Sequence, residues 1–154
     1  MGIKKFLGIL ILTIAFFFSN LCVQAQTVRV GISNQSFSSL DYSDITLFAL
    51  STVYVYEKDT KKELLKLDRE TNFQITLKDG KYTILTEEMK KPLKTEQNLL
   101  IVSPTGWIGI NGLKRGGKQA YYRGQFEILK SEKKKDRFYL VNVLDSEEYL
   151  RGVV

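Results

Sequence analysis

The sequence predicts a mostly β fold in which short-stranded hairpins form a sandwich or barrel-like domain that ends in the start of one α-helix. Short runs of alternating apolar and polar residues recur along the chain, which is the period of half-buried strands. Turn signals separate these runs every 8 to 12 residues or so, as in all-β folds. Helical patterns are confined to an N-terminal apolar segment and to the end of the chain.

The N-terminal segment, residues 1–25, has the pattern of a secretory signal peptide and is expected to be helical. Lys4 and Lys5 form its basic region, residues 6–18 are mainly apolar, and a small-residue cleavage site ends at Ala25. The apolar run is shorter than the roughly 20 residues that a membrane span requires. We therefore expect export with cleavage after Ala25, and a retained membrane anchor is the alternative.

The composition excludes several classes of catalytic chemistry. The chain has 154 residues, no His, 1 Cys, and 23 Lys+Arg against 17 Asp+Glu. Because Cys22 would leave with the signal segment, the mature chain would have no disulfide and no thiol nucleophile. Without histidine, His-dependent triads and most zinc sites are excluded as well, and we expect neither a metal nor a cofactor. Residues 26–154 are enough for one domain core.

The residue pattern in the first part of the mature chain predicts two strands, the second of which leads into a hairpin turn. Alternation indicates a strand over residues 28–32, and the Ser-, Asn- and Asp-rich composition of residues 33–43 indicates a loop. Residues 45–56 are predicted as one strand, with tyrosines on one face and valines on the other. A turn at 58–61 returns the chain into a strand over 63–67, which gives the first hairpin.

The clearest hairpin joins strands over residues 73–77 and 82–85. Its turn contains Asp79-Gly80, a pair that readily takes the positive φ angles of tight hairpin turns. Residues 87–95 are charged and contain Pro92, so they are predicted as a loop.

A further hairpin is predicted between residues 99–102 and 107–110, with its turn at 104–106. Asn111-Gly112 and Gly116-Gly117 interrupt the alternation after it. The chain then enters its closing hairpin.

The closing hairpin is predicted to consist of a strand over 121–130, a turn at 131–135 and a second, more apolar strand from Phe138. A helix follows, for which Asp145 is the expected N-cap and Glu148 a capping-box partner that reaches back. The helical pattern lasts for only about two and a half turns, which is too few for a stable isolated helix. We therefore expect the chain to be a fragment.

Spaced residues in this closing segment carry a family resemblance. They are Tyr122, Arg123, Gly124, Asn142, Glu147, Tyr149 and Gly152. Residues 121–154 resemble the opening of the domain shared by the stage II sporulation protein D and the amidase enhancer LytB (SpoIID/LytB). In that family the pattern continues into Pro-x-Glu-Met, whose glutamate is the acid/base of a peptidoglycan lytic transglycosylase. The resemblance implies that the catalytic Glu lies beyond Val154, and it divides the mature chain into an N-terminal β region (26–120) and the start of this domain (121–154).

The expected function is that of an exported, cell-wall (peptidoglycan)-associated protein, located in the wall, the periplasm or outside the cell. The resemblance implies a full-length form that acts in sporulation or wall turnover as a lytic transglycosylase or amidase enhancer, and it leaves open whether the protein is an enzyme. The alternatives are a non-catalytic wall-binding or amidase-activating module, and an envelope structural protein. Expected partners are peptidoglycan or another anionic wall polymer and a wall amidase, but no nucleic acid.

One basic cluster is a candidate polymer-binding surface. Lys114, Arg115 and Lys118 lie on a glycine-rich stretch close to Tyr121. Positive charge can hold an anionic polymer while an aromatic ring stacks on its sugars. The structural alternative is a solvated loop that leads into a strand.

Three other features have both a functional and a structural interpretation. Trp107 could join Tyr54 and Tyr56 in a sugar-stacking platform, although aromatic residues on strands more often pack in cores or across strands. The run of lysines at 133–135 fits the protective charge of a hairpin tip. The adjacent carboxylates Glu147-Glu148 could serve glycoside cleavage, but their place in the first helical turn favours a capping role.

Overall fold

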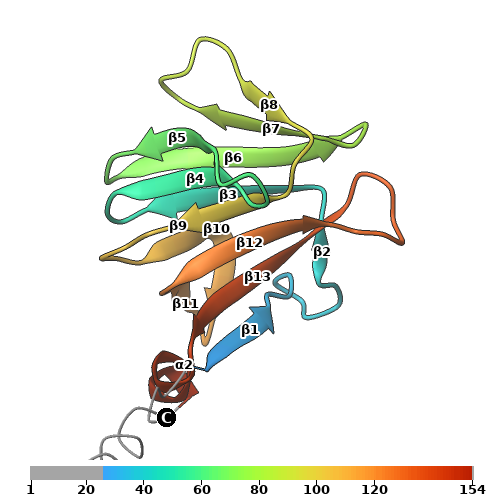
Figure 1. Ribbon diagram of the computed structural model, residues 1–154. Helices are drawn as coiled ribbons and strands as arrows, with labels where there is room; N and C mark the ends of the chain where they lie inside the picture. The colour runs from blue at the N-terminus through green and yellow to red at the C-terminus, as the bar shows by residue number, and fades with distance from the viewer. Residues whose placement is uncertain (1–25, 154) are drawn as a thin grey trace, which may run out of the picture.

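The computed structural model describes residues 26–153, which form two antiparallel sheets packed in a sandwich-like arrangement, followed by a short helix (Figure 1). The mostly β fold that the sequence predicts is therefore confirmed. The predicted signal helix (1–25) lies outside the described residues. Among the helices described, none has the length and apolar character needed to cross a membrane.

The seven-stranded sheet has the order β1-β13-β12-β9-β4-β5, and β2 pairs with β13 off this path. Its strands come from both ends of the described chain, so β1 lies at one edge beside β13, the last strand. The bounds are β1 (Thr27–Gly31), β2 (Asp41–Tyr42), β4 (Val53–Glu57), β5 (Glu63–Leu67), β9 (Leu99–Val102), β12 (Gln125–Lys130) and β13 (Phe138–Asp145).

The six-stranded sheet has the order β11-β10-β3-β6-β7-β8. Both sheets take strands from the range 26–120, and β11 runs across the boundary between that range and 121–153. The bounds are β3 (Asp44–Ala49), β6 (Thr71–Lys78), β7 (Lys81–Thr86), β8 (Leu93–Thr95), β10 (Ile108–Arg115) and β11 (Lys118–Tyr122). Helix α2 (Ser146–Val153) follows β13 directly, next to the start of β1, where the Ser146 N–H donates to the Gln26 carbonyl at 2.9 Å (Figure 1).

The core lies between the sheets and is filled by alternating side chains from both. Its largest fully buried members include Tyr82, Phe73, Phe126 and Phe138. The Tyr82 ring meets Phe138 edge-on at 5.9 Å, and burial raises the pKa of its hydroxyl. Each such side chain contributes about 1.5 to 3 kcal/mol through removal from water.

The predicted strand over 45–56 is wrong in one respect, because it is two strands in different sheets. Residues 50–52 separate β3 from β4 and carry the chain across the sandwich. Odd-numbered residues stay buried on both sides of this crossing, from Ile45 to Ala49 and again at Val53 and Val55. Both sheets turn their inner faces to the same core, so the alternation of buried and exposed residues continues in phase from β3 to β4. The sequence pattern therefore does not reveal the crossing.

The predicted hairpin of 99–102 with 107–110 is wrong for the same reason. Strand β9 pairs with β4 and β12, whereas β10 pairs with β3 and β11 in the other sheet. The predicted strand over 121–130 is likewise divided, at Arg123-Gly124, into β11 and β12 of opposite sheets.

Three smaller expectations also fail. The predicted loop over 33–43 contains the two-residue strand β2, which pairs with β13. The predicted loop over 87–95 contains the short edge strand β8, which pairs with β7. Strand β10 continues through Asn111-Gly112, where a register shift against β11 takes up the irregularity, and only Gly116-Gly117 forms a turn.

Several local predictions are confirmed. The 73–77 and 82–85 hairpin is β6–β7, with Asp79 and Gly80 at φ angles of 50° and 73°. The hairpin through 58–61 joins β4 and β5. Helix α2 is capped as expected, since the Glu148 N–H donates to Asp145 Oδ1 at 2.7 Å.

Candidate functional site

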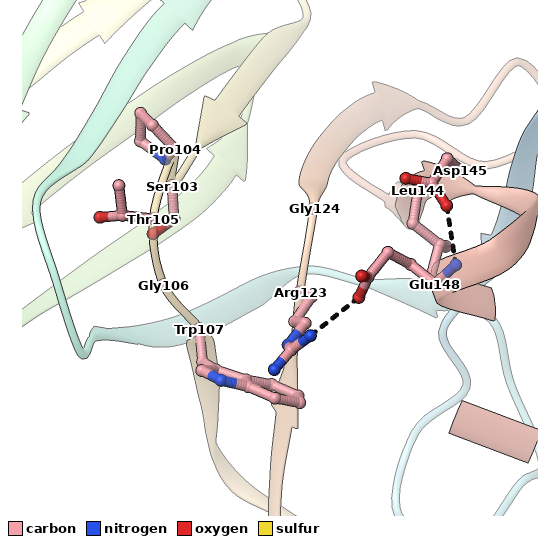
Figure 2. A pocket seen from close by; sticks show the side chains of 10 residues that line it. All are labelled: Ser103, Pro104, Thr105, Gly106, Trp107, Arg123, Gly124, Leu144, Asp145 and Glu148. Atoms are coloured by element: carbon pink, nitrogen blue, oxygen red, sulfur yellow. Dashed lines mark hydrogen bonds and ion pairs between the residues drawn. The ribbon is translucent and has the colours of Figure 1, made fainter. Parts of the chain in front are cut away.

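The candidate site lies at the end of the sandwich where α2 begins, and segments that cross between the sheets build it. The crossing at 50–52 is tied to the crossing at 103–107 by a hydrogen bond between the Ser51 and Ser103 hydroxyls at 2.8 Å. The Leu50 N–H also donates to the Trp107 carbonyl at 3.3 Å. The third crossing, at 123–124, brings Arg123 beside the Trp107 indole (Figure 2).

Arg123 lies between an aromatic ring and a carboxylate. Its Cζ is 4.4 Å from the centroid of the Trp107 ring, and its Nη1 is 3.0 Å from Glu148 Oε2 (Figure 2). Glu148 Oε1 accepts a second guanidinium, that of Arg151, at 3.3 Å. The Glu148 carboxylate is thus engaged by two arginines, and this replaces the expected reach back to the start of the helix.

Two hollows flank this Trp107–Arg123–Glu148 group, and all three residues line both of them. The first, of about 420 Å³, is also lined by the crossing segment 103–106, Gly124 and the cap residue Asp145 (Figure 2). The second, of about 540 Å³, lies between the edge strands β1 and β11 and is more apolar. Its lining includes Val30, Ile32, Tyr121, Tyr122, Leu144 and Tyr149.

Gly124 and Asn142 hold the Arg123 backbone in place. Gly124 has a φ of +85°, and a Cβ on it would come within 2.4 Å of the Val143 carbonyl oxygen. Asn142 is only 5% exposed, and its Nδ2 donates to the carbonyls of Arg123 at 2.7 Å and of Gln125 at 3.1 Å. These contacts satisfy two carbonyls at a point where the strands change sheets, so they fix the direction in which the arginine leaves the backbone.

The arrangement presents an exposed aromatic face beside charged groups, a combination that can bind a sugar ring. Trp107 is 41% exposed, and an indole face packs against the apolar face of a sugar ring while the flanking charges hydrogen-bond its hydroxyls. Glycosidases place two carboxyl groups on either side of the scissile bond. Here Glu147 is largely exposed and only 3.8 Å from Arg151, and Glu148 is bound by arginines. Within residues 26–153, no cluster of three or more Asp, Glu, His or Cys side chains is placed to hold a metal.

The residues of the family pattern lie mostly at this site. Tyr122, Arg123, Asn142 and Tyr149 line the second hollow, and Gly124 lines the first. Glu147 lines neither, and the Gly152 position belongs to the last turn of α2.

The predicted polymer-binding cluster is divided. Tyr121 lines the second hollow with Trp107, but Lys114, Arg115 and Lys118 do not line either hollow. They lie at the tip of the β10–β11 hairpin, where Arg115 donates to the Ser33 carbonyl at 2.6 Å. Arg115 therefore anchors the neighbouring loop to the hairpin, a structural role that the sequence did not indicate.

Two other candidate groups also lie apart from Trp107. Tyr54 and Tyr56 stack on each other on one face of β4, with ring centroids 6.2 Å apart, and line neither hollow. The lysine run at 133–135 is not simply solvated, since Lys134 Nζ lies 2.7 Å from the nearly buried Asp41 carboxylate. Hydrogen bonding from Lys134, supported by Ser39, holds the pKa of Asp41 below its ordinary value.

Sequence reasoning missed the contribution of Ser51, Ser103 and Arg151. The one available signal is the glycine at 106, where a Cβ would collide with the Ser51 side chain.

Comparisons with protein-family models, with curated proteins and with solved structures found no match.

Proposed function

We propose that this protein is an exported, wall-associated protein of the SpoIID/LytB type that binds peptidoglycan glycan strands in the two hollows beside Trp107. The observation that carries the proposal is the exposed indole, held by Arg123 between two hollows of about 420 and 540 Å³. The clustering of Tyr122, Arg123, Asn142 and Tyr149 around the second hollow supports a common role for the residues that resemble the family.

In the proposed complex, Trp107 stacks on one sugar, and Tyr121 and Tyr149 bound the neighbouring position in the more apolar hollow. Arg123 and Arg151 supply donors for the carboxylates that wall glycans and their peptides carry. The lytic transglycosylase or amidase-enhancer activity of a full-length form rests on the resemblance alone. The contacts of Glu147 and Glu148 favour a positioning role for both.

Sedimentation with purified wall sacculi tests the binding site. We expect Trp107→Ala to weaken binding about tenfold, which corresponds to roughly 1.4 kcal/mol and is reasonable for one lost aromatic contact. Leu85→Ala is the matched control, because Leu85 is 40% exposed on β7 and lies outside both hollows. If both variants fold and bind like the wild type, the Trp107 site is not the binding site.

Export is tested separately by intact-mass analysis of material secreted by an expressing host. A mature N-terminus at Gln26 is the expected result, since signal segments of about 25 residues are removed as a unit. Full-length protein found only in membranes would favour the retained anchor and argue against a freely secreted form.

A further inference from the structure

A second exposed surface lies in the loop between β1 and β2, away from the Trp107 hollows. Phe37 is 72% exposed and Leu40 52%, and these two large apolar side chains are only three positions apart. Phe37 also has a φ of +58°, in the left-handed region that bulky residues seldom adopt. A strained position that displays an aromatic ring to water calls for a functional explanation.

The loop is held in this shape by its own hydrogen bonds. Asn34 Oδ1 accepts the Ser38 N–H at 3.0 Å, and the Asn34 N–H donates to the Ser39 carbonyl at 2.8 Å. The Phe37 N–H donates to the Asn34 carbonyl at 3.2 Å. The turn that carries Phe37 is therefore held in a defined conformation by these hydrogen bonds.

The basic tip of the β10–β11 hairpin supports one side of this loop. The Arg115 guanidinium donates to the Ser33 and Asn34 carbonyls at 2.6 and 3.3 Å, and its Cζ lies 4.4 Å from the Phe37 ring. The Lys114 N–H donates to Gln35 Oε1 at 2.6 Å. These contacts bring the end of the hairpin, which carries the exposed residues Lys114 and Lys118, next to the loop whose apolar tip is formed by Phe37 and Leu40.

A further lysine lies on the other side of the tip. Lys134 forms its ion pair with Asp41, and both residues line a hollow of about 320 Å³ together with Phe37 and Leu40. The apolar tip is thus bordered by basic side chains from two different hairpins.

We propose that this surface, Phe37 and Leu40 with Lys114, Lys118 and Lys134, docks on an anionic lipid membrane. Apolar side chains enter the boundary between headgroups and acyl chains, while neighbouring lysines are attracted to anionic headgroups. A soluble anionic polymer would use the lysines and could stack a sugar on Phe37, but it would gain little from the exposed aliphatic side chain of Leu40. An anionic membrane would therefore bind both the apolar side chains and the lysines of this surface.

Insertion can be measured directly with a fluorescent residue at position 37. Trp107 is the single tryptophan of the chain, so Phe37→Trp in a Trp107→Phe background reports only on the loop. The protein with residues 1–154 is mixed with vesicles of phosphatidylglycerol and phosphatidylcholine whose acyl chains are brominated. Because quenching requires contact with the chains, attachment through residues 1–25 alone does not produce it. Leu85→Trp in the same background is the control, because Leu85 is an exposed apolar residue on β7 that lies outside the loop.

We expect quenching at position 37 and not at position 85, and a loss of at least half of it in the Lys114→Ala/Lys118→Ala variant or at high salt. No quenching at 37 with protein bound to the vesicles, or no binding at all, overturns the proposal. An emission change at 37 with soluble polyphosphate but not with vesicles would assign the surface to a polymer instead. If Phe37→Trp does not fold, Leu40→Trp gives the same readout. Sacculus binding through Trp107 is measured separately, and none of these outcomes decides it.

Discussion

Replacing Gly124 with alanine tests whether the crossing beneath Arg123 is as tightly built as the structure shows. The residue has a φ of +85°, and an added Cβ would meet the Val143 carbonyl oxygen at 2.4 Å and the Leu144 Cβ at 3.2 Å. Gly117 is the matched control, with a φ of +80° and no atom within 4 Å of its Cβ position. Both substitutions incur the left-handed backbone cost, but only that at Gly124 adds a collision.

The expected magnitudes follow from these two contributions. The left-handed conformation costs an ordinary residue about 1 to 2 kcal/mol, which is the whole expected effect of Gly117→Ala. The collision at Gly124 is with the backbone of β13, which is paired with β1 on one side and β12 on the other. Since overpacking that shifts a backbone costs about 1 to 3 kcal/mol, the free energy of unfolding of Gly124→Ala should fall by about 3 kcal/mol in total.

Urea unfolding measures the difference. We expect both variants to keep the wild-type m value and to differ in midpoint, with Gly124→Ala about 5 °C or more below Gly117→Ala in a parallel thermal scan. Equal losses in the two variants would show that the close approach to Val143 does not exist. The reasoning about how Arg123 is positioned would then be wrong as well.

Three further predictions concern the same fold. Asn142→Ala should lower the free energy of unfolding by about 2 to 4 kcal/mol in urea, because it removes the side-chain donor that two carbonyls share, and a loss below about 1 kcal/mol would contradict this. Because Lys134 lowers the pKa of Asp41, that pair stabilises the protein above the ordinary pKa of 3.8, and the contribution is lost as the pH falls through the lower folded value. Lys134→Ala should therefore flatten the fall in urea midpoint between about pH 5 and pH 2, and an unchanged slope would refute the coupling. Glu148→Gln removes the exposed ion pair of Arg123, so it should lower the free energy of unfolding by less than about 1 kcal/mol yet weaken sacculus binding. Unchanged binding would contradict the role of Glu148 in positioning Arg123.

The sequence predicts those parts of the fold whose information is local. Asp79-Gly80 specifies its hairpin turn and Asp145 caps the helix, because each depends on contacts within a few residues. The assignment of strands to sheets is not local. Residues 45–56 keep one alternation through a crossing, so no pattern within them distinguishes one long strand from two short ones.

The same limit applies to the candidate site. Arg123 and Asn142 were noted for their resemblance to a family, but their contact was not predicted, since it joins residues 19 positions apart across the break between two strands. The stacking of Arg123 on Trp107 depends on two crossings that the sequence does not reveal. The basic cluster was predicted as one surface and is divided, because Tyr121 and Lys118 lie at different places along β11.

Crossings between sheets explain why structural residues and candidate binding residues are interleaved at this end of the molecule. Where a strand leaves its sheet, backbone groups lose their ladder partners and must be satisfied by side chains or by other crossings. Asn142 does this for the Arg123 carbonyl, and the Ser51–Ser103 pair ties two crossings together. Substitutions at those positions should therefore reduce stability and binding together. Trp107 is exposed and its ring stacks with Arg123. Its substitution should therefore reduce binding with little loss of stability, and that separation distinguishes a ligand site from a folding defect.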